Sequence, residues 1–150
     1  MKIEAIEKYG APSISIGGLN IWIHSREFQV NDYWDGNSLN ATALCSTPTA
    51  KVWCTGAFLH LDGLSRWYKE ILQLNDLLKG TASLNCWEPG LLVDMEINKT
   101  GHIATRVQIT GDQMTESHEF KFSFDQTLLP ELIESLKAVF KTYPLKKNKE

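Results

Sequence analysis

The sequence lacks the features that mark membrane-spanning, exported and disulfide-stabilised proteins. No apolar run approaches the ~20 residues that a membrane helix needs. The N-terminal stretch MKIEAIEKYGAPS has none of the apolar character, over roughly 7–15 residues, of a secretory signal. There are three cysteines, and without an export signal we expect them to be reduced and mostly buried. We therefore expect a cytoplasmic protein with no membrane partner.

The sequence also lacks the basic excess with which nucleic-acid binders hold phosphates. Lys and Arg number 15 against 18 Asp and Glu, a net charge of −3, so we expect no nucleic-acid partner. With 150 residues, 43% of them hydrophobic, the chain can form a core without a metal or disulfide. No repeat or linker divides it, and we expect one globular domain over residues 1–144 and a loose basic tail over 145–150.

Motifs for catalysis and for metal binding are absent as well. The cysteines and histidines form no C-x₂₋₄-C or H-x₃₋₅-H pair, on which structural zinc sites rely. There is no G-x-S-x-G nucleophile motif, and Gly17-Gly18 lacks the Lys-Ser/Thr of a phosphate loop. Asp94 and Glu96 share a strand face and could do acid–base work, but Arg106 is well placed to pair with Asp94. The sequence therefore indicates no catalytic residue, no metal, no cofactor and no enzyme activity.

Two segments have the three-to-four-residue apolar spacing of amphipathic helices. The first is predicted over residues 62–79, with Asp62 as N-cap and Gly80 in the left-handed position that ends a helix. The second is predicted over residues 127–142, with Pro130 in its first turn, where the missing N–H has no partner to lose.

Much of the remaining chain alternates between apolar and polar residues, as strands do. Two helices are too few for repeated βαβ units. The predicted fold is therefore α+β, mostly antiparallel sheet of about seven or eight strands with two helices. The strand-like segments are 19–24, 39–45, 52–61, 82–87, 91–97, 103–109 and 119–124.

The tripeptide Lys99-Thr100-Gly101 permits a prediction of strand register. It is typical of a three-residue hairpin turn with Gly101 in the left-handed conformation. Such a turn pairs Ile97 with Ile103 and sets Asp94 directly opposite Arg106. The alternating apolar residues of the two strands then pair with each other on the core face, and a slip of one residue would destroy this pairing.

The segment Arg26–Leu39 differs from the rest of the chain. It reads REFQVNDYWDGNSL, with aromatic residues in a stretch too polar to be a strand and with Asp-Gly-Asn, which is common in turns. The aromatic residues could anchor this loop on the core, or they could form an aromatic and acidic surface that binds a partner. In the second interpretation, the candidate partner-binding residues are Glu27, Asp32, Tyr33, Trp34, Asp35 and Asn37.

Several motifs along the chain occur in the order found in a known family, and over roughly residues 19–144 the chain resembles the WapI-like family of bacterial immunity proteins. It departs from the family pattern at Ser38, where a tryptophan is common, and at Leu128, where an aromatic residue is common. The shared motifs are Arg26-Glu27-Phe28, Asp32-Tyr33-Trp34-Asp35-Gly36-Asn37, Leu78-x-Gly80-x-Ala82-x-Leu84, Glu88-Pro89-x-Leu91, Gly101-His102-Ile103, Phe124-Asp125-Gln126-Thr127 and Tyr143-Pro144.

The resemblance implies a small cytoplasmic α+β protein that binds the toxin domain, commonly a nuclease, of a neighbouring secreted or contact-dependent toxin and neutralises it. It also implies no enzyme activity and no cofactor, and we expect a monomer or weak dimer. Two alternatives stay open. One is a β-rich module that binds a small ligand or a sugar through Trp34, Trp53 or Trp87, and the other is an enzyme that uses a Cys/His pair.

Overall fold

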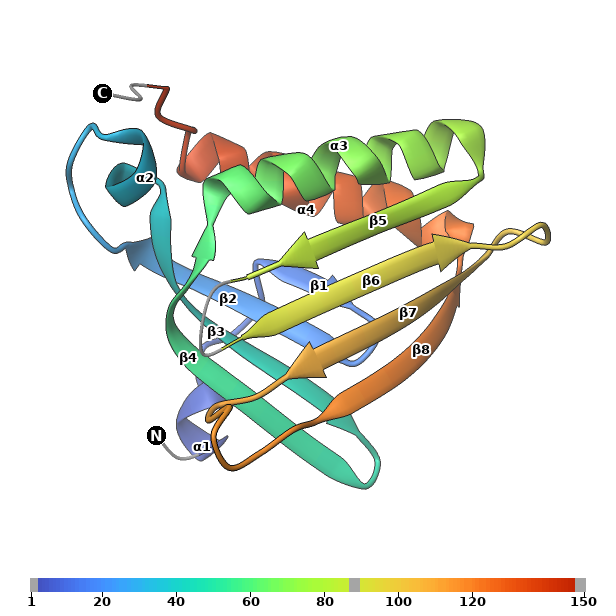
Figure 1. The fold of residues 1–150 in the computed structure, drawn as a ribbon, viewed down its shortest axis with the longest axis horizontal. Coiled ribbons are helices and arrows are strands. Elements are labelled where there is room, and N and C mark those ends of the chain that lie inside the picture. The colour runs from blue at the N-terminus through green and yellow to red at the C-terminus, as the bar shows by residue number, and fades with distance from the viewer. Residues whose placement is uncertain (1–2, 87–89, 148–150) are drawn as a thin grey trace.

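Two antiparallel sheets of four strands each form the frame of the molecule (Figure 1). The computed structural model describes residues 3–86 and 90–147. Within each sheet the strands lie in chain order, so the predicted α+β fold with antiparallel pairing is confirmed. The first sheet contains β1 (Ile14–Ile16), β2 (Leu19–Arg26), β3 (Ser38–Thr47) and β4 (Ala50–His60), and the second contains β5 (Gly80–Asn85), β6 (Leu91–Ile97), β7 (His102–Ile109) and β8 (Glu119–Asp125).

The two long helices lie together beside the edges of the sheets (Figure 1). α3 (Leu61–Leu77) connects the first sheet to the second and lies against β5, and α4 (Leu129–Thr142) packs on α3 and on β1. Within the described residues, no helix is both long and apolar enough to span a bilayer. The short helical segments are α1 (Ile3–Glu7), α2 (Tyr33–Gly36) and the 3₁₀ turn η1 (Gln126–Leu128).

Both predicted helices form, but their ends differ from the prediction. The N-cap of α3 is His60 rather than Asp62, because the His60 Nδ1 accepts a hydrogen bond from the Asp62 backbone N–H at 3.0 Å. At the other end, Leu78 rather than Gly80 is the left-handed cap, with φ of 52°. The predicted second helix divides into η1 and α4, and Pro130 lies in the first turn of α4 as predicted.

The predicted register of β6 and β7 is confirmed. Ile97 pairs with Ile103, and Asp94 lies opposite Arg106. Gly101 has a φ of 85°, which a glycine adopts without steric cost. This turn thus sets which residues of the second sheet face the core and which face outward.

The main core lies between the two sheets and extends beneath α3 and α4. It takes alternate residues from the strands, as the period of two requires. Trp67 is its largest fully buried side chain, and it comes from the predicted apolar stripe of α3. The other buried residues of the two helix stripes are Leu61, Leu64, Ile71, Leu74, Leu129, Leu132, Ile133, Leu136 and Val139.

Two residues of the predicted loose tail, Leu145 and Lys146, contact the rest of the chain. The Lys146 N–H donates to Asn37 Oδ1 at 2.9 Å, and Asn37 Nδ2 donates to the Lys146 carbonyl oxygen at 2.8 Å. Leu145 packs on the main core. The basic composition of this segment could not reveal the bonds to Asn37, because they are made by the Lys146 backbone. Residues 148–150 of the predicted tail lie outside the described residues.

Candidate functional site

The candidate partner-binding loop, residues 27–37, connects β2 to β3 and contains α2 (Figure 1). We call it the α2 loop. Its helical turn forms because the Asp32 carboxylate accepts hydrogen bonds from the backbone N–H groups of Trp34, at 3.0 Å, and Asp35, at 2.9 Å. Asp is among the preferred N-cap residues. The Gly36 N–H donates to the Asp32 carbonyl oxygen and closes this short helical turn. The turn predicted from Asp-Gly-Asn is therefore the end of α2.

Arg26 and Gly36 hold the α2 loop close to the end of β2. The Arg26 guanidinium donates to the carbonyl oxygens of Gly36 and Pro144, each at 2.6 Å, and lies over the Tyr143 ring, 6.0 Å from its centroid. A Cβ atom on Gly36 would lie 2.5 Å from the Val30 carbonyl oxygen. The loop can close this tightly only because residue 36 has no side chain.

Aromatic contacts and hydrogen bonds join α2 to the start of α3. The Tyr33 hydroxyl donates to the Asp62 carboxylate, and His60 Nε2 donates to the Trp34 carbonyl oxygen at 2.8 Å. The Trp34 ring centroid lies 4.9 Å from that of Tyr33, edge to face, and 5.6 Å from that of His60. Burial and the bond to Asp62 raise the pKa of Tyr33 to about 12. The phenol therefore stays protonated, as the donor of that bond, at neutral pH.

The α2 loop exposes large apolar side chains to solvent. Trp34 is 52% exposed, Phe28 46% and Val30 43%. Several exposed large apolar side chains on one short loop make that loop a candidate interaction surface. The other exposed large apolar residues of the described chain belong to other segments and are Leu77, Leu78, Met114 and Leu128.

Four of the six predicted site residues have exposed or half-buried side chains. Trp34 and Asp35 are exposed, so both are available to a partner. Asp32 is half-buried because it caps α2. Glu27 is also half-buried, and its carboxylate accepts a hydrogen bond from Ser38 Oγ at 3.0 Å.

Tyr33 and Asn37, the other two, lie inside, with exposures of 6% and 0%. We therefore assign them a supporting role in the loop. Phe28 and Val30 belong to the exposed surface although they were not among the predicted site residues. The sequence did contain a signal for their exposure. Both residues lie in a polar and irregular stretch that could not bury two large apolar side chains.

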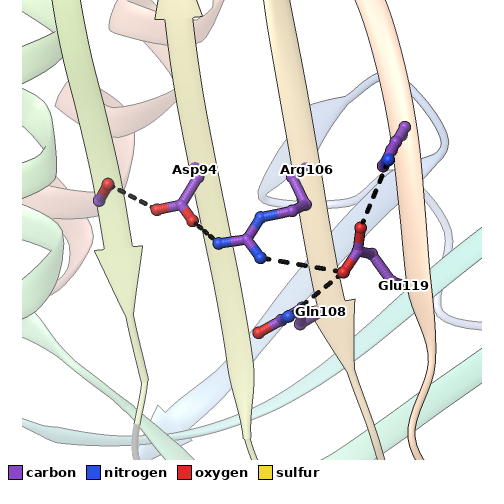
Figure 2. A network of polar contacts seen from close by, with 6 residues as sticks. Asp94, Arg106, Gln108 and Glu119 are labelled. Carbon is purple, nitrogen blue, oxygen red and sulfur yellow. Dashed lines mark hydrogen bonds and ion pairs between the residues drawn. The ribbon is translucent and has the colours of Figure 1, made fainter.

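A second group of polar side chains crosses the outer face of the second sheet (Figure 2). Ser83 Oγ donates to one oxygen of Asp94 at 2.7 Å, and the Arg106 guanidinium donates to the other. The same guanidinium lies 3.8 Å from the Glu119 carboxylate. A hollow of about 470 Å³ opens on this face. Glu119 also contacts Gln108, at 3.3 Å, and Lys121, at 3.9 Å.

This network pairs its charges with one another. The hydrogen bond from Ser83, together with the Arg106 guanidinium, holds the pKa of Asp94 below its usual range. A general acid or base works best with a pKa near the operating pH, and the pKa of Asp94 is shifted away from it. The network has the properties of a stabilised sheet face, and the predicted pairing of Asp94 with Arg106 is confirmed.

The remaining candidate residues for ligand binding or catalysis give little support for a site. Trp53 packs against a small apolar cluster around Trp22, and Trp87 lies outside the described residues. Burial raises the pKa of Cys45 and of Cys54 to about 12, so both are neutral thiols at neutral pH. Among the described residues, no three His, Cys, Asp or Glu side chains come together in a way that could hold a metal ion.

Comparison with known proteins identifies the family. The model of the immunity protein WapI-like family matches residues 13–144, which include both sheets, the α2 loop and the two long helices. The chain belongs to this family. The match confirms the resemblance seen in the sequence. No curated protein and no solved structure matches this WapI-like family member.

Proposed function

We propose that this protein acts in the bacterial cytoplasm, where it binds the toxin domain of a neighbouring secreted or contact-dependent toxin and neutralises it. The toxin domain, in this proposal, is a nuclease. The family match over residues 13–144 carries the proposal, because it assigns the chain an immunity-type function. The protein would act by contact alone, without catalysis or a cofactor, as a monomer or weak dimer.

The α2 loop supports the proposal as the contact surface. Trp34, Phe28 and Val30 supply exposed apolar area, and tryptophan is among the residues most often found at interface hot spots. The cap from Asp32 and the bond from His60 fix the backbone beneath the indole. A surface that is already ordered loses little conformational entropy on binding.

The charges of the α2 loop favour a basic partner. The carboxylates of Glu27, Asp32 and Asp35 outnumber the two cations beside them, Arg26 and Lys146. A nuclease must hold a polyanion, so its binding surface exposes Lys and Arg. Because the local excess is small, we expect the apolar residues to supply most of the affinity and the carboxylates to supply orientation and specificity.

The experiment that tests the function is co-expression with the C-terminal domain of the toxin encoded by the neighbouring reading frame. We expect the parent protein to protect cells from that domain and to copurify with it. Growth inhibition that the parent protein does not relieve, with no complex formed, would show that the proposed function is wrong.

A charge variant tests the surface separately. Asp32→Asn with Asp35→Asn removes two charges but keeps an N-cap residue at position 32. We expect it to bind the toxin domain ~1–3 kcal/mol more weakly than the parent. Asp76→Asn with Glu134→Gln removes two charges from exposed positions of α3 and α4 and should bind as the parent does. Equal affinity of the two double variants would place the interface elsewhere.

A further inference from the structure

The segment that comes after α4 bonds to the α2 loop and to Arg26 at the end of β2. The Pro144 carbonyl oxygen accepts from Arg26 at 2.6 Å, and the Lys146 ammonium donates to the Val30 carbonyl oxygen. The Lys146 backbone pairs with the side chain of Asn37 through both its N–H and its carbonyl oxygen. Residues more than a hundred positions apart in the sequence are thus joined directly at the candidate site.

Asn37 shows how closely the two segments depend on each other. Its side chain is fully buried, and its amide uses one acceptor and two donors to bond backbone groups. Two of these three bonds go to Lys146, and the third goes to the Tyr33 carbonyl oxygen inside α2, at 2.8 Å. If residues 144–147 moved away, the buried amide would lose two of its partners and water would have to replace them.

We infer that residues 144–147 form a strap that holds the α2 loop in its binding conformation, with Asn37 as the positioning residue that joins strap to loop. The inference rests on the proposed function only where it concerns binding. The bonds of the strap to Arg26 and to Asn37 are made by backbone groups of Pro144 and Lys146. Lys146 adds a bond to Val30 and brings its aliphatic stem to Gly36, where a Cβ atom would lie 3.0 Å from Lys146 Cδ.

Hydrogen exchange of the backbone amides tests the strap without any partner. A variant that ends at Leu145 lacks Lys146 and all later residues, and a control variant that ends at Lys147 keeps the strap. We expect the amides of Trp34, Asp35 and Gly36 to exchange at least about tenfold faster in the first variant, with the amides of α4 and of the second sheet unchanged. The control should exchange as the parent does. Unchanged exchange in the variant ending at Leu145 would overturn the inference.

A point substitution gives a second test on the full chain. Asn37→Asp keeps the size of the side chain and one acceptor for the Lys146 N–H, but a carboxylate cannot donate to the carbonyl oxygens of Tyr33 and Lys146. We expect the same faster exchange in the α2 loop. Lys146→Ala keeps both backbone bonds to Asn37 and should change the exchange less than Asn37→Asp does. The opposite order would show that the lysine side chain, and not the backbone pairing, holds the loop, and would contradict the role given to Asn37.

Affinity for the toxin domain of the neighbouring reading frame separates the strap from the proposed function. We expect the variant ending at Leu145 to bind about tenfold or more weakly, and the control to bind as the parent does. Faster loop exchange with parental affinity would support the strap and overturn the α2 loop as the toxin-binding surface. If the parent itself fails to bind the domain, the proposed function is wrong, while the exchange experiment still decides the strap.

Discussion

The imidazole of His60 donates a hydrogen bond from Nε2 to the backbone carbonyl oxygen of Trp34, 2.8 Å away. Its other nitrogen, Nδ1, accepts from the Asp62 N–H at 3.0 Å, which fixes the neutral tautomer with the proton on Nε2. One side chain thus caps α3 and supports the α2 loop. The element that carries the candidate site is therefore coupled to the helix that joins the two sheets.

Replacing His60 should reveal both roles. We expect His60→Ala to lower the free energy of unfolding by about 1–3 kcal/mol, because it removes the N-cap and leaves the Trp34 carbonyl oxygen without this donor. His60→Asn keeps a preferred N-cap residue and should recover roughly 1 kcal/mol of that loss. Urea denaturation followed by circular dichroism measures both values. If His60→Ala unfolds at the same urea concentration as the parent, the imidazole stabilises neither the start of α3 nor the α2 loop.

Two glycines offer a matched pair of substitutions. Gly36→Ala places a methyl group 2.5 Å from the Val30 carbonyl oxygen, so the backbone must shift, and we expect a loss of about 1–3 kcal/mol in stability. Gly63→Ala lies in the first turns of α3, where a Cβ would make an ordinary contact of 3.6 Å with the Asn85 carbonyl oxygen. There we expect a gain of about 0.4–1 kcal/mol. Thermal melting of the two variants should move in opposite directions, and a shift in the same direction would contradict the close packing at Gly36.

The lowered pKa of Asp94 predicts how the stability of the folded protein depends on pH. The pKa of Asp94 is lowered in the folded protein, chiefly by the hydrogen bond from Ser83 and then by Arg106. The unfolded chain therefore takes up a proton at a higher pH than the folded protein does. The stabilising contribution is present in full above the ordinary carboxyl pKa of about 3.9 and is lost as the pH falls through the lowered value.

A carboxyl titration followed by NMR measures this directly. We expect Ser83→Ala and Arg106→Gln each to raise the pKa of Asp94 toward its ordinary value, because each removes a hydrogen bond to the carboxylate. Thr81→Ala, on the same face of β5, serves as the control and should leave the titration of Asp94 unchanged. A titration of Asp94 that is the same in the parent and in Ser83→Ala would contradict the network in Figure 2.

The sheets and the two long helices could be predicted from the sequence because their signals are local. Alternation over 91–97 and 103–109, with a glycine in the turn between them, specified both the strands and their register. The ends of α3 could not be predicted as well. A histidine acts as N-cap and a leucine adopts the left-handed conformation, and neither residue is the usual choice at its position.

The position of the candidate site could be predicted from the sequence, but the contacts that hold it could not. Asp-Tyr-Trp-Asp within a polar stretch indicated the loop, and Trp34 is exposed in the structure. The partners that hold the loop, His60 and Lys146, lie far along the chain and contact it through one ring nitrogen, backbone groups and one ammonium group. Such contacts leave no periodic pattern. For the same reason the sequence could not show that Tyr33 and Asn37 face inward.

Calorimetric titration with the C-terminal domain of the neighbouring toxin tests whether this protein binds that domain through the α2 loop. Trp34→Ala should weaken binding by about 2 kcal/mol or more. Because half of the indole is exposed, stability should fall by only about 1 kcal/mol. Leu77→Ala, which removes another exposed apolar side chain, at the C-terminal end of α3, is the matched control and should bind as the parent does. Parental affinity for Trp34→Ala would contradict binding of the toxin domain through the α2 loop.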